Sequence, residues 1–584
     1  MAVQGEDVIQ TLLWPQPTKI NMIQSGQISL NENWECKIVS PNNLIYSSDI
    51  LNSACKRYHG YISKKNSIYE PNQNIINTVK IQINQINATL NLETNETYSI
   101  TIDERSSSVN ISAENTFGAL RALETFSQLV SENFTLPFVN IIDSPRFDHR
   151  ELLVDTARYY LNISFLEHII DSMSFSKLNV LHWHAIDSQS FPIESKKYPL
   201  LSEKGQFKGH SHLCASASCV YSETDIRNLI EYAKQRGIRV MLEVDTPGHS
   251  KSWGQAYKNM TVNFCTLNAD SVPLNPTIPF TLDVVSGFIN EMISGSNPIF
   301  PDEFIHLGGD EVDLNCWGKN KAIEEYMTKN HLTTATLLSQ WISQVRKNVD
   351  DASNNNKRVM YWEDAFNYTT GLTKNSNNKT VFAVWKDKQT LHSIANAGSA
   401  TTLSAGWYIH SQSKWTDFYD NEPFDGNNTD WTPEEKMLVY GGAVSYWGCS
   451  GFCPFPFTAD KFDSRTWPVA AAAAERLWSS ETVTDHTQAL PSSQSQYAKT
   501  LRILNTESRG ALTDTLSRGI CGWSTSGDCP FTSSEYFGST YESGKSYFYH
   551  KQNKLVRHED LRKTSFGDNS LDLIMSSEVF EHMP

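Results

Sequence analysis

The chain has 584 residues, of which 39% are hydrophobic and 20% charged, and its formal net charge is −16. This acidic balance, with no basic run, argues against a nucleic-acid partner, because phosphate binding needs a basic surface. No stretch is long and apolar enough to span a membrane. The length and the hydrophobic content predict a globular protein with more than one domain and a large core.

Cysteines and glycosylation sequons indicate the compartment. Ten cysteines occur, none in a C-x-x-C unit, and their even number favours disulfides formed in an oxidising space. Nine N-x-S/T sequons point the same way, at Asn87, Asn95, Asn110, Asn133, Asn162, Asn259, Asn367, Asn378 and Asn427. We expect a lysosomal or secreted glycoprotein. Because the N-terminus lacks an apolar signal segment, we interpret the signal peptide as already removed.

Residues 1–145 have the pattern of a smaller α+β domain. Alternating polar and apolar residues predict half-buried strands over Val79–Ile83 and Tyr98–Ile102, because neighbouring side chains of a strand face opposite sides. Helices are expected over Ser48–Tyr61 and Thr116–Ser131. This first domain is predicted to end near the Asp-Ser-Pro-Arg run at 143–146.

Residues 146–515 alternate short β-rich runs with amphipathic helices, a pattern typical of a parallel sheet. Ser164 and Glu167 are expected to form a capping box at one helix, and Ser222 to cap the next. Eight strands are expected, over Leu152–Asp155, Asn179–His184, Arg239–Val244, Phe304–Leu307, Arg358–Trp362, Thr380–Trp385, Ala400–Ser404 and Gly442–Trp447. Eight such units predict an α/β fold, a (β/α)8 TIM barrel. Residues 516–584 are expected to form a C-terminal tail.

A parallel barrel carries its active site at the C-terminal ends of its strands, where the βα loops converge. Charged residues follow the first four strands, namely Arg158, Asp187, Asp245 with His249, and the pair Asp310-Glu311. Aromatic residues follow the other four, namely Trp362, Trp385, Trp407-Tyr408 and Trp447. Acids, an arginine and tryptophans on one rim indicate a sugar pocket, because tryptophan faces stack on pyranose rings.

Five runs of the barrel segment carry a family likeness. They are LVDTARYYL (153–161), NVLHWHAIDSQSFP (179–192), GIRVMLEVDTPGHSKSW (237–253), FIHLGGDEVDLNCW (304–317) and AAAAERLWSS (471–480). Two shorter runs, LWPQP (13–17) and RYHGYI (57–62), precede them. Together these runs resemble the β-N-acetylhexosaminidases of glycoside hydrolase family 20. The resemblance implies removal of terminal β-linked N-acetylglucosamine or N-acetylgalactosamine from glycans by substrate-assisted, retaining catalysis, without a cofactor or a metal.

The resemblance also implies roles for the acidic pair. Glu311 matches the general acid/base, and Asp310 the residue that holds the N–H of the substrate's 2-acetamido group. Gly308 and Gly309 permit the irregular backbone that lets two consecutive side chains serve one site. Tyr408 matches the phenol that donates to the acetamide oxygen.

Further positions match the rest of the family's site. Trp362, Trp385 and Trp447 resemble an aromatic box, and Arg158 resembles the arginine that grips the sugar hydroxyls. Asp187 and His249 resemble a dyad behind the acid/base. Cys265 and Cys316 align with a disulfide of the family, and relatives are commonly dimers, so a homodimer is possible.

Two positions depart from the family pattern. His410 stands where the family usually has an acidic or amide residue, and Cys449 where it usually has a glutamate. Both normally bind hydroxyls of the terminal sugar, so weaker or altered sugar preference is expected. A glycan-binding relative with reduced activity is the alternative function.

Simpler interpretations stay open for several of these residues. His182 and His184 have the spacing of zinc ligands but no evident third ligand, so a structural role is favoured over a zinc hydrolase. Asp310-Glu311 taken alone could be a solvated acidic pair, and any single tryptophan could be barrel packing. Local disulfides are expected for Cys214–Cys219 and Cys521–Cys529, with Cys36–Cys55 and Cys449–Cys453 as further candidates.

Overall fold

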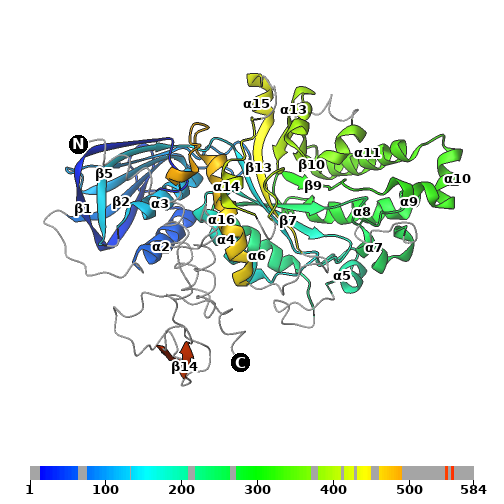
Figure 1. The fold of residues 1–584 in the computed structure, drawn as a ribbon, viewed down its shortest axis with the longest axis horizontal. Coiled ribbons are helices and arrows are strands. Elements are labelled where there is room, and N and C mark those ends of the chain that lie inside the picture. The colour runs from blue at the N-terminus through cyan, green and yellow to red at the C-terminus, as the bar shows by residue number, and fades with distance from the viewer. Residues whose placement is uncertain are drawn as a thin grey trace.

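The structure is a computed structural model in which a small closed β-sheet at the N-terminus packs beside a larger, eight-stranded barrel (Figure 1). It describes residues 13–63, 75–131, 133–207, 218–262, 271–369, 379–409, 413–425, 431–448, 459–489, 546–549 and 554–557. None of the helices in these ranges has the length and apolar character needed to cross a membrane.

The N-terminal domain is α+β, as the sequence predicts. Its strands are β1 (Lys19–Val39), β2 (Ile75–Gln85), β3 (Tyr98–Ile102), β4 (Ser108–Asn115) and β5 (Thr135–Asp143), and its helices are α2 (Asp49–Ser63) and α3 (Thr116–Leu129). The sheet closes in the order β1-β2-β4-β3-β5. Alternate residues of β2, β3 and β4 are buried, which confirms the predicted half-buried strands. A disulfide joins Cys36 of β1 to Cys55 of α2 and confirms that predicted pair.

The larger domain is a closed barrel of eight parallel strands in sequential order, which confirms the predicted fold. Its strands are β6 (His149–Asp155), β7 (Val180–Ile186), β8 (Arg239–Val244), β9 (Phe304–His306), β10 (Arg358–Trp362), β11 (Thr380–Val384), β12 (Ala400–Leu403) and β13 (Val439–Tyr446). All eight expected strands are present, with ends that shift by at most three residues from the prediction.

Helices follow most barrel strands and cover the outside of the barrel (Figure 1). They are α4 (Ile163–Phe175), α5 (Leu200–Gly205), α6 (Glu223–Lys234), α7 (Lys251–Ala256), η1 (Lys258–Met260), α8 (Pro279–Ile293), α9 (Leu314–Lys319), α10 (Lys321–Lys329), α11 (Thr334–Ser353), η2 (Glu363–Tyr368), α13 (Lys388–Asn396), α14 (Trp415–Tyr419), α15 (Pro433–Leu438) and α16 (Ala459–Trp478). In the tail, β14 (Ser546–Tyr549) pairs with β15 (Lys554–Arg557).

One helix start differs from the prediction. The N-cap of α4 is Asn162, whose side chain accepts from the backbone N–H of Phe165, so the expected Ser164/Glu167 capping box is wrong. Asn162 can cap α4 because the short amide side chain of an asparagine accepts from an otherwise free helix N–H as well as a serine hydroxyl does. Ser222 caps α6 as predicted, in a capping box with Asp225.

Buried ion pairs join the two domains. Glu96, just before β3, accepts hydrogen bonds from Arg121 of α3 and from Arg150 of β6. Asp143 at the end of β5 pairs with Lys177 at 3.0 Å and accepts the indole N–H of Trp478 at 3.1 Å. Removing one partner of such a pair leaves a buried charge, so these contacts fix the N-terminal domain against the barrel.

Candidate active site

The barrel interior holds a polar layer below its mouth. Residues of even and odd number alternate between inside and outside, so His182 and His184 of β7 point inward with Glu243 of β8 and His306 of β9. Glu243 accepts from His184 Nδ1 at 2.5 Å and lies 2.9 Å from His182 Nε2 and 3.2 Å from His306 Nδ1. All four side chains are fully buried.

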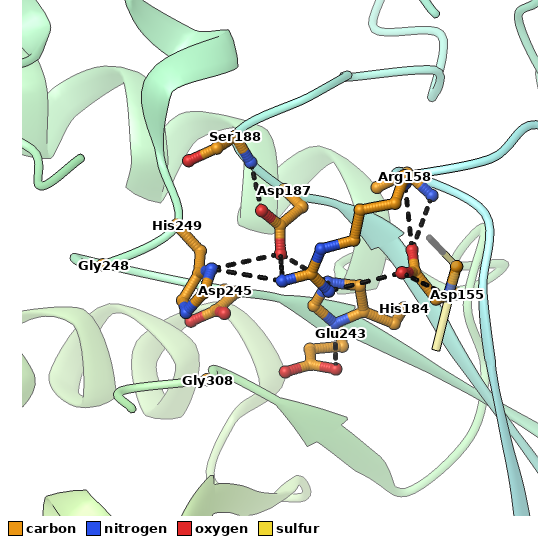
Figure 2. A network of polar contacts seen from close by, with 12 residues as sticks. Asp155, Arg158, His184, Asp187, Ser188, Glu243, Asp245, Gly248, His249 and Gly308 are labelled. Carbon is orange, nitrogen blue, oxygen red and sulfur yellow. Dashed lines mark hydrogen bonds and ion pairs between the residues drawn. The ribbon is translucent and has the colours of Figure 1, made fainter. Parts of the chain in front are cut away.

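Above this layer Arg158 and Asp187 form a buried ion pair of 2.8 Å (Figure 2). Asp155 holds the same guanidinium at 3.3 Å, and His184 Nε2 lies 2.9 Å from Asp187. Burial alone would raise the pKa of Asp187, but the charges of Arg158 and His249 hold it far below its ordinary value. Asp187 is therefore a permanent anion at acidic and neutral pH.

His249 connects Asp187 to the acidic pair. Its Nδ1 lies 3.4 Å from Asp187, and its Nε2 lies 3.3 Å from Glu311 Oε2 and 3.7 Å from Asp310 Oδ2. Burial lowers the pKa of His249, but the surrounding carboxylates, Asp187 first, raise it well above its ordinary value. The His249 imidazole thus faces both carboxyl groups, and the surrounding charges favour its protonated form.

The backbone that presents the acidic pair is irregular, as the two glycines predict. Gly308, Gly309 and Glu311 all have positive φ, at +67°, +90° and +47°. A Cβ on Gly308 would stand 1.8 Å from Asp245 Oδ1, so only glycine fits there. The turn directs Asp310 and Glu311 to the same mouth, although consecutive residues of a regular strand would diverge.

The two carboxyl groups differ in exposure and in protonation. The Asp310 side chain is 14% exposed and its Oδ1 has no hydrogen-bond partner among the described residues, whereas Glu311 is 48% exposed. Burial, with the charges of Glu243 and Asp364, raises the pKa of Asp310 to about 6 against the effect of His249. His249 lowers the pKa of Glu311 below its ordinary value.

Four aromatic rings from four strand ends stand beside the acidic pair. The ring centroids are 5.9 Å apart for Trp362 and Trp447, 6.3 Å for Trp447 and Tyr408, and 6.1 Å for Tyr408 and Trp385. Trp362 is buried, and the other three are half-buried at the mouth. The structure therefore brings together the predicted residues Arg158, Asp187, His249, Asp310, Glu311, Trp362, Trp385, Tyr408 and Trp447.

Five of the expected residues lie outside the described residues, namely Cys265, Asn378, His410, Asn427 and Cys449. Cys316 is disulfide-bonded, and its expected pairing with Cys265 stays a prediction. The seven other sequon asparagines are exposed or half-buried.

Two polar groups of the site, Asp155 and Glu243, were not expected. With His184 and the fully buried Asp245, they support the predicted residues from within or just after strands. Burial and the neighbouring Asp310 raise the pKa of Asp245 well above its ordinary value. A signal was available in the sequence, because a charged residue inside an otherwise apolar strand needs a buried partner.

The sequence shows no third zinc ligand beside the His182-Trp183-His184 run, whereas the fold brings Glu243 and His306 next to His182 in one cluster. Their contacts nevertheless suit hydrogen bonds better than metal ligation. Ligands at 2.0–2.1 Å from a tetrahedral zinc ion stand about 3.3 Å apart around one metal. Here Glu243 faces His182 through Oε2 at 2.9 Å and His306 through Oε1 at 3.2 Å, so the two imidazoles approach different oxygens. A structural role for these histidines remains the favoured interpretation.

An acidic pair, a buried cation and an aromatic wall at the mouth of a (β/α)8 barrel define a glycoside hydrolase, and comparisons with known proteins agree. Residues 147–481 match the family described as "Glycosyl hydrolase family 20, catalytic domain", and residues 13–129 match "beta-acetyl hexosaminidase like". The chain therefore belongs to glycoside hydrolase family 20.

Relatives and solved structures support this assignment. Human beta-hexosaminidase subunit beta is 36% identical over 498 residues, covering 81% of this chain and 84% of that protein. Beta-hexosaminidase subunit A1 of Dictyostelium discoideum is 32% identical over 476 residues, covering 78% and 83%. The chitobiase of Flavobacterium johnsoniae superposes with a TM-score of 0.72 at 27% identity, covering 85% of this chain and 73% of that one.

Proposed function

We propose that this chain removes terminal β-linked N-acetylhexosamine from the non-reducing ends of glycans, with the substrate's own 2-acetamido oxygen as nucleophile. The observation that carries the proposal is the pair at the mouth: a half-exposed Glu311 beside an Asp310 whose Oδ1 has no hydrogen-bond partner in the part of the chain that the structure describes. An unpaired buried carboxylate oxygen is costly unless a ligand supplies its hydrogen bond. The N–H of an acetamide group is such a donor.

In this mechanism Glu311 protonates the glycosidic oxygen while the acetamide oxygen attacks the anomeric carbon, and an oxazolinium intermediate forms. Glu311 then takes a proton from the water that opens the intermediate. The His249 imidazolium behind Glu311 stabilises the carboxylate that remains after the first proton transfer. Asp310 holds the acetamide N–H and balances the positive charge of the oxazolinium ring.

The other groups position the sugar. Tyr408 donates to the acetamide oxygen, and Trp362, Trp385 and Trp447 enclose the acetamide methyl group and one face of the ring. Arg158, fixed by Asp187 and Asp155, binds the ring hydroxyls. The acceptance of both N-acetylglucosamine and N-acetylgalactosamine is part of the proposal, as is any effect of His410 and Cys449 on that preference.

Turnover of aryl N-acetyl-β-glucosaminide and N-acetyl-β-galactosaminide tests the proposal, with Glu311→Gln as the variant. Loss of a general acid lowers kcat by about 10²–10⁴-fold. Glu325→Gln, on the exposed face of α10, is the matched control and should behave as wild type. A chain that binds N-acetylglucosamine without hydrolysing either substrate would be the glycan-binding relative instead.

We further propose that the chain works in the lysosome or outside the cell, as a glycoprotein and as a homodimer. The Cys36–Cys55 disulfide and the oxidised Cys219 and Cys316 support an oxidising compartment. Intact mass before and after glycosidase treatment, and light scattering of the purified chain, test the glycans and the dimer.

A further inference from the structure

Glu243 lies inside the barrel, below the residues that contact the sugar, and its carboxyl group lies close to side chains of three other strands. One oxygen, Oε2, accepts from His184 at 2.5 Å and lies 2.9 Å from His182, both on β7. The other, Oε1, accepts the indole N–H of Trp362 on β10 at 2.8 Å and lies 3.2 Å from His306 on β9. No part of Glu243 is exposed to solvent.

One branch of these contacts leads to the acid/base. His184 turns its second nitrogen to Asp187 at 2.9 Å, and Asp187 contacts His249 Nδ1 at 3.4 Å (Figure 2). His249 Nε2 then faces Glu311 at 3.3 Å. Acidic and imidazole groups alternate along this path, so each imidazole is oriented from both of its nitrogens.

The other branch leads to the acetamide pocket. The bond to Glu243 is the one hydrogen bond described for the Trp362 indole, and it fixes the ring 5.9 Å from Trp447. An anionic acceptor makes such a bond stronger than a neutral one. Among the described residues, Glu243 is the one that forms hydrogen bonds with both His184 and Trp362.

We propose that Glu243 is a positioning residue. Through His184 it orients the row of carboxyl and imidazole groups that ends at Glu311, and through Trp362 it fixes the wall of the acetamide pocket. This inference rests on the proposed function. It assigns no contact with substrate to Glu243. Its effect reaches the reaction through His184 on one side and Trp362 on the other.

The titratable groups that face Glu243 determine the expected pH effect, though not all of them are charged. They are His182 and His184 of β7, His306 of β9, and Asp245 and Asp310 beyond the strand ends. The Glu243 charge helps to raise the pKa of Asp310. Removing that charge should therefore lower the pKa of Asp310 and move the corresponding limb of the pH profile to lower pH.

Glu151 offers a matched control. It is equally buried, and it binds two imidazoles, His149 at 2.6 Å and His182 at 2.6 Å, but it contacts neither His184 nor Trp362. Glu243→Gln and Glu151→Gln each replace one carboxylate by an amide in the same network, so both should lower the Tm. Only the first should change catalysis.

The experiment measures Tm and the pH dependence of kcat/KM on an aryl N-acetyl-β-glucosaminide for both variants. We expect Glu243→Gln to lower kcat/KM by at least 10-fold, on the order of the loss of one hydrogen bond to a charged group, and to shift the limb near pH 6 downward. Glu151→Gln should keep the wild-type profile. Equal kcat/KM and equal profiles for the two variants would overturn the inference.

Trp362→Phe keeps the inference testable if Glu243→Gln does not fold. This variant keeps an aromatic wall and removes only the N–H that Glu243 accepts, so KM should rise while the pH profile stays unchanged; an unaltered KM contradicts the inference. The two proposals fail differently. If the wild-type chain shows no turnover, the proposed function is contradicted. If the wild-type chain shows turnover but Glu243→Gln and Glu151→Gln have the same kcat/KM and the same pH profile, only the role of Glu243 is contradicted.

Discussion

His249 and Glu311 face each other across 3.3 Å, and both have a left-handed backbone, with φ of +48° and +47°. Residues other than glycine adopt this conformation at a cost, and such strain is concentrated at functional sites. Here it allows loops after two different strands to direct an imidazole and a carboxyl group at each other. From this position His249 lowers the pKa of Glu311 and opposes the rise that burial causes in the pKa of Asp310.

The pH profile of kcat/KM should be a bell with its optimum on the acidic side of neutrality. The active form has Glu311 protonated and Asp310 ionised, and the two limbs of the profile report the titration of this pair. The limb at higher pH should lie near 6, the pKa of Asp310, and the limb at lower pH should lie below the ordinary pKa of a glutamate, because His249 lowers the pKa of Glu311. His249→Gln removes a cation that lowers both values. Its bell should move to higher pH as a whole, with a lower maximum; an unmoved bell would show that the imidazole is neutral.

The free energy of unfolding should decrease as the pH rises from 5 to 7.5. Burial raises the pKa of Glu475 to about 7 and that of Glu363 to about 7. A carboxyl group whose folded pKa is raised contributes stability that is complete below its unfolded pKa of about 4.3 and is lost as the pH rises through the folded value.

Glu475→Gln tests this stability effect away from the active site, since Glu475 binds the backbone N–H of Gln16 near the domain interface. The amide cannot ionise, so the fall in Tm between pH 5 and pH 7.5 should be smaller in the variant, by the equivalent of about 1–3 kcal/mol. A variant with the same pH slope as wild type would assign the slope to other groups.

Trp385→Ala should weaken sugar binding without unfolding the protein. The ring is half-buried at the mouth, and its indole N–H donates to Asp364 at 2.9 Å. Aromatic contacts contribute about 0.5–1.5 kcal/mol beyond buried area, so KM should rise about 3- to 10-fold. Trp385→Phe should recover most of this loss, and a KM unchanged in both variants would place the sugar elsewhere.

Gly308→Ala should damage both stability and activity, and Gly398→Ala is its control. Both glycines have positive φ, +67° and +80°, but the added Cβ meets Asp245 at 1.8 Å in the first case and nothing within 4 Å in the second. Alanine at positive φ costs about 1 kcal/mol, and overpacking adds about 1–3 kcal/mol. Thermal unfolding and kcat measure the difference between the two variants. Equal losses of Tm would mean that the turn at Gly308 accommodates the added Cβ, and would contradict this prediction.

The sequence predicts the barrel well because buried parallel strands leave a strong local signal. The eight apolar runs and the glycines before Asp310 sufficed to place the strands and the irregular turn. The start of α4 was missed because Ser164 and Asn162 are both good caps, and local sequence does not decide between them. Partners in the polar layer, such as Glu243 with Trp362, could not be predicted, since 119 positions separate them.

Aryl 2-acetamido-β-glucosides that carry zero to three fluorine atoms on the acetyl group test the central claim most directly. Fluorine withdraws electrons from the acetamide oxygen while the leaving group stays the same. If that oxygen is the nucleophile, held by Asp310 as Glu311 protonates the leaving group, kcat/KM must fall steeply with each fluorine. A rate independent of fluorine number would mean that a protein side chain attacks the sugar, and would contradict the account.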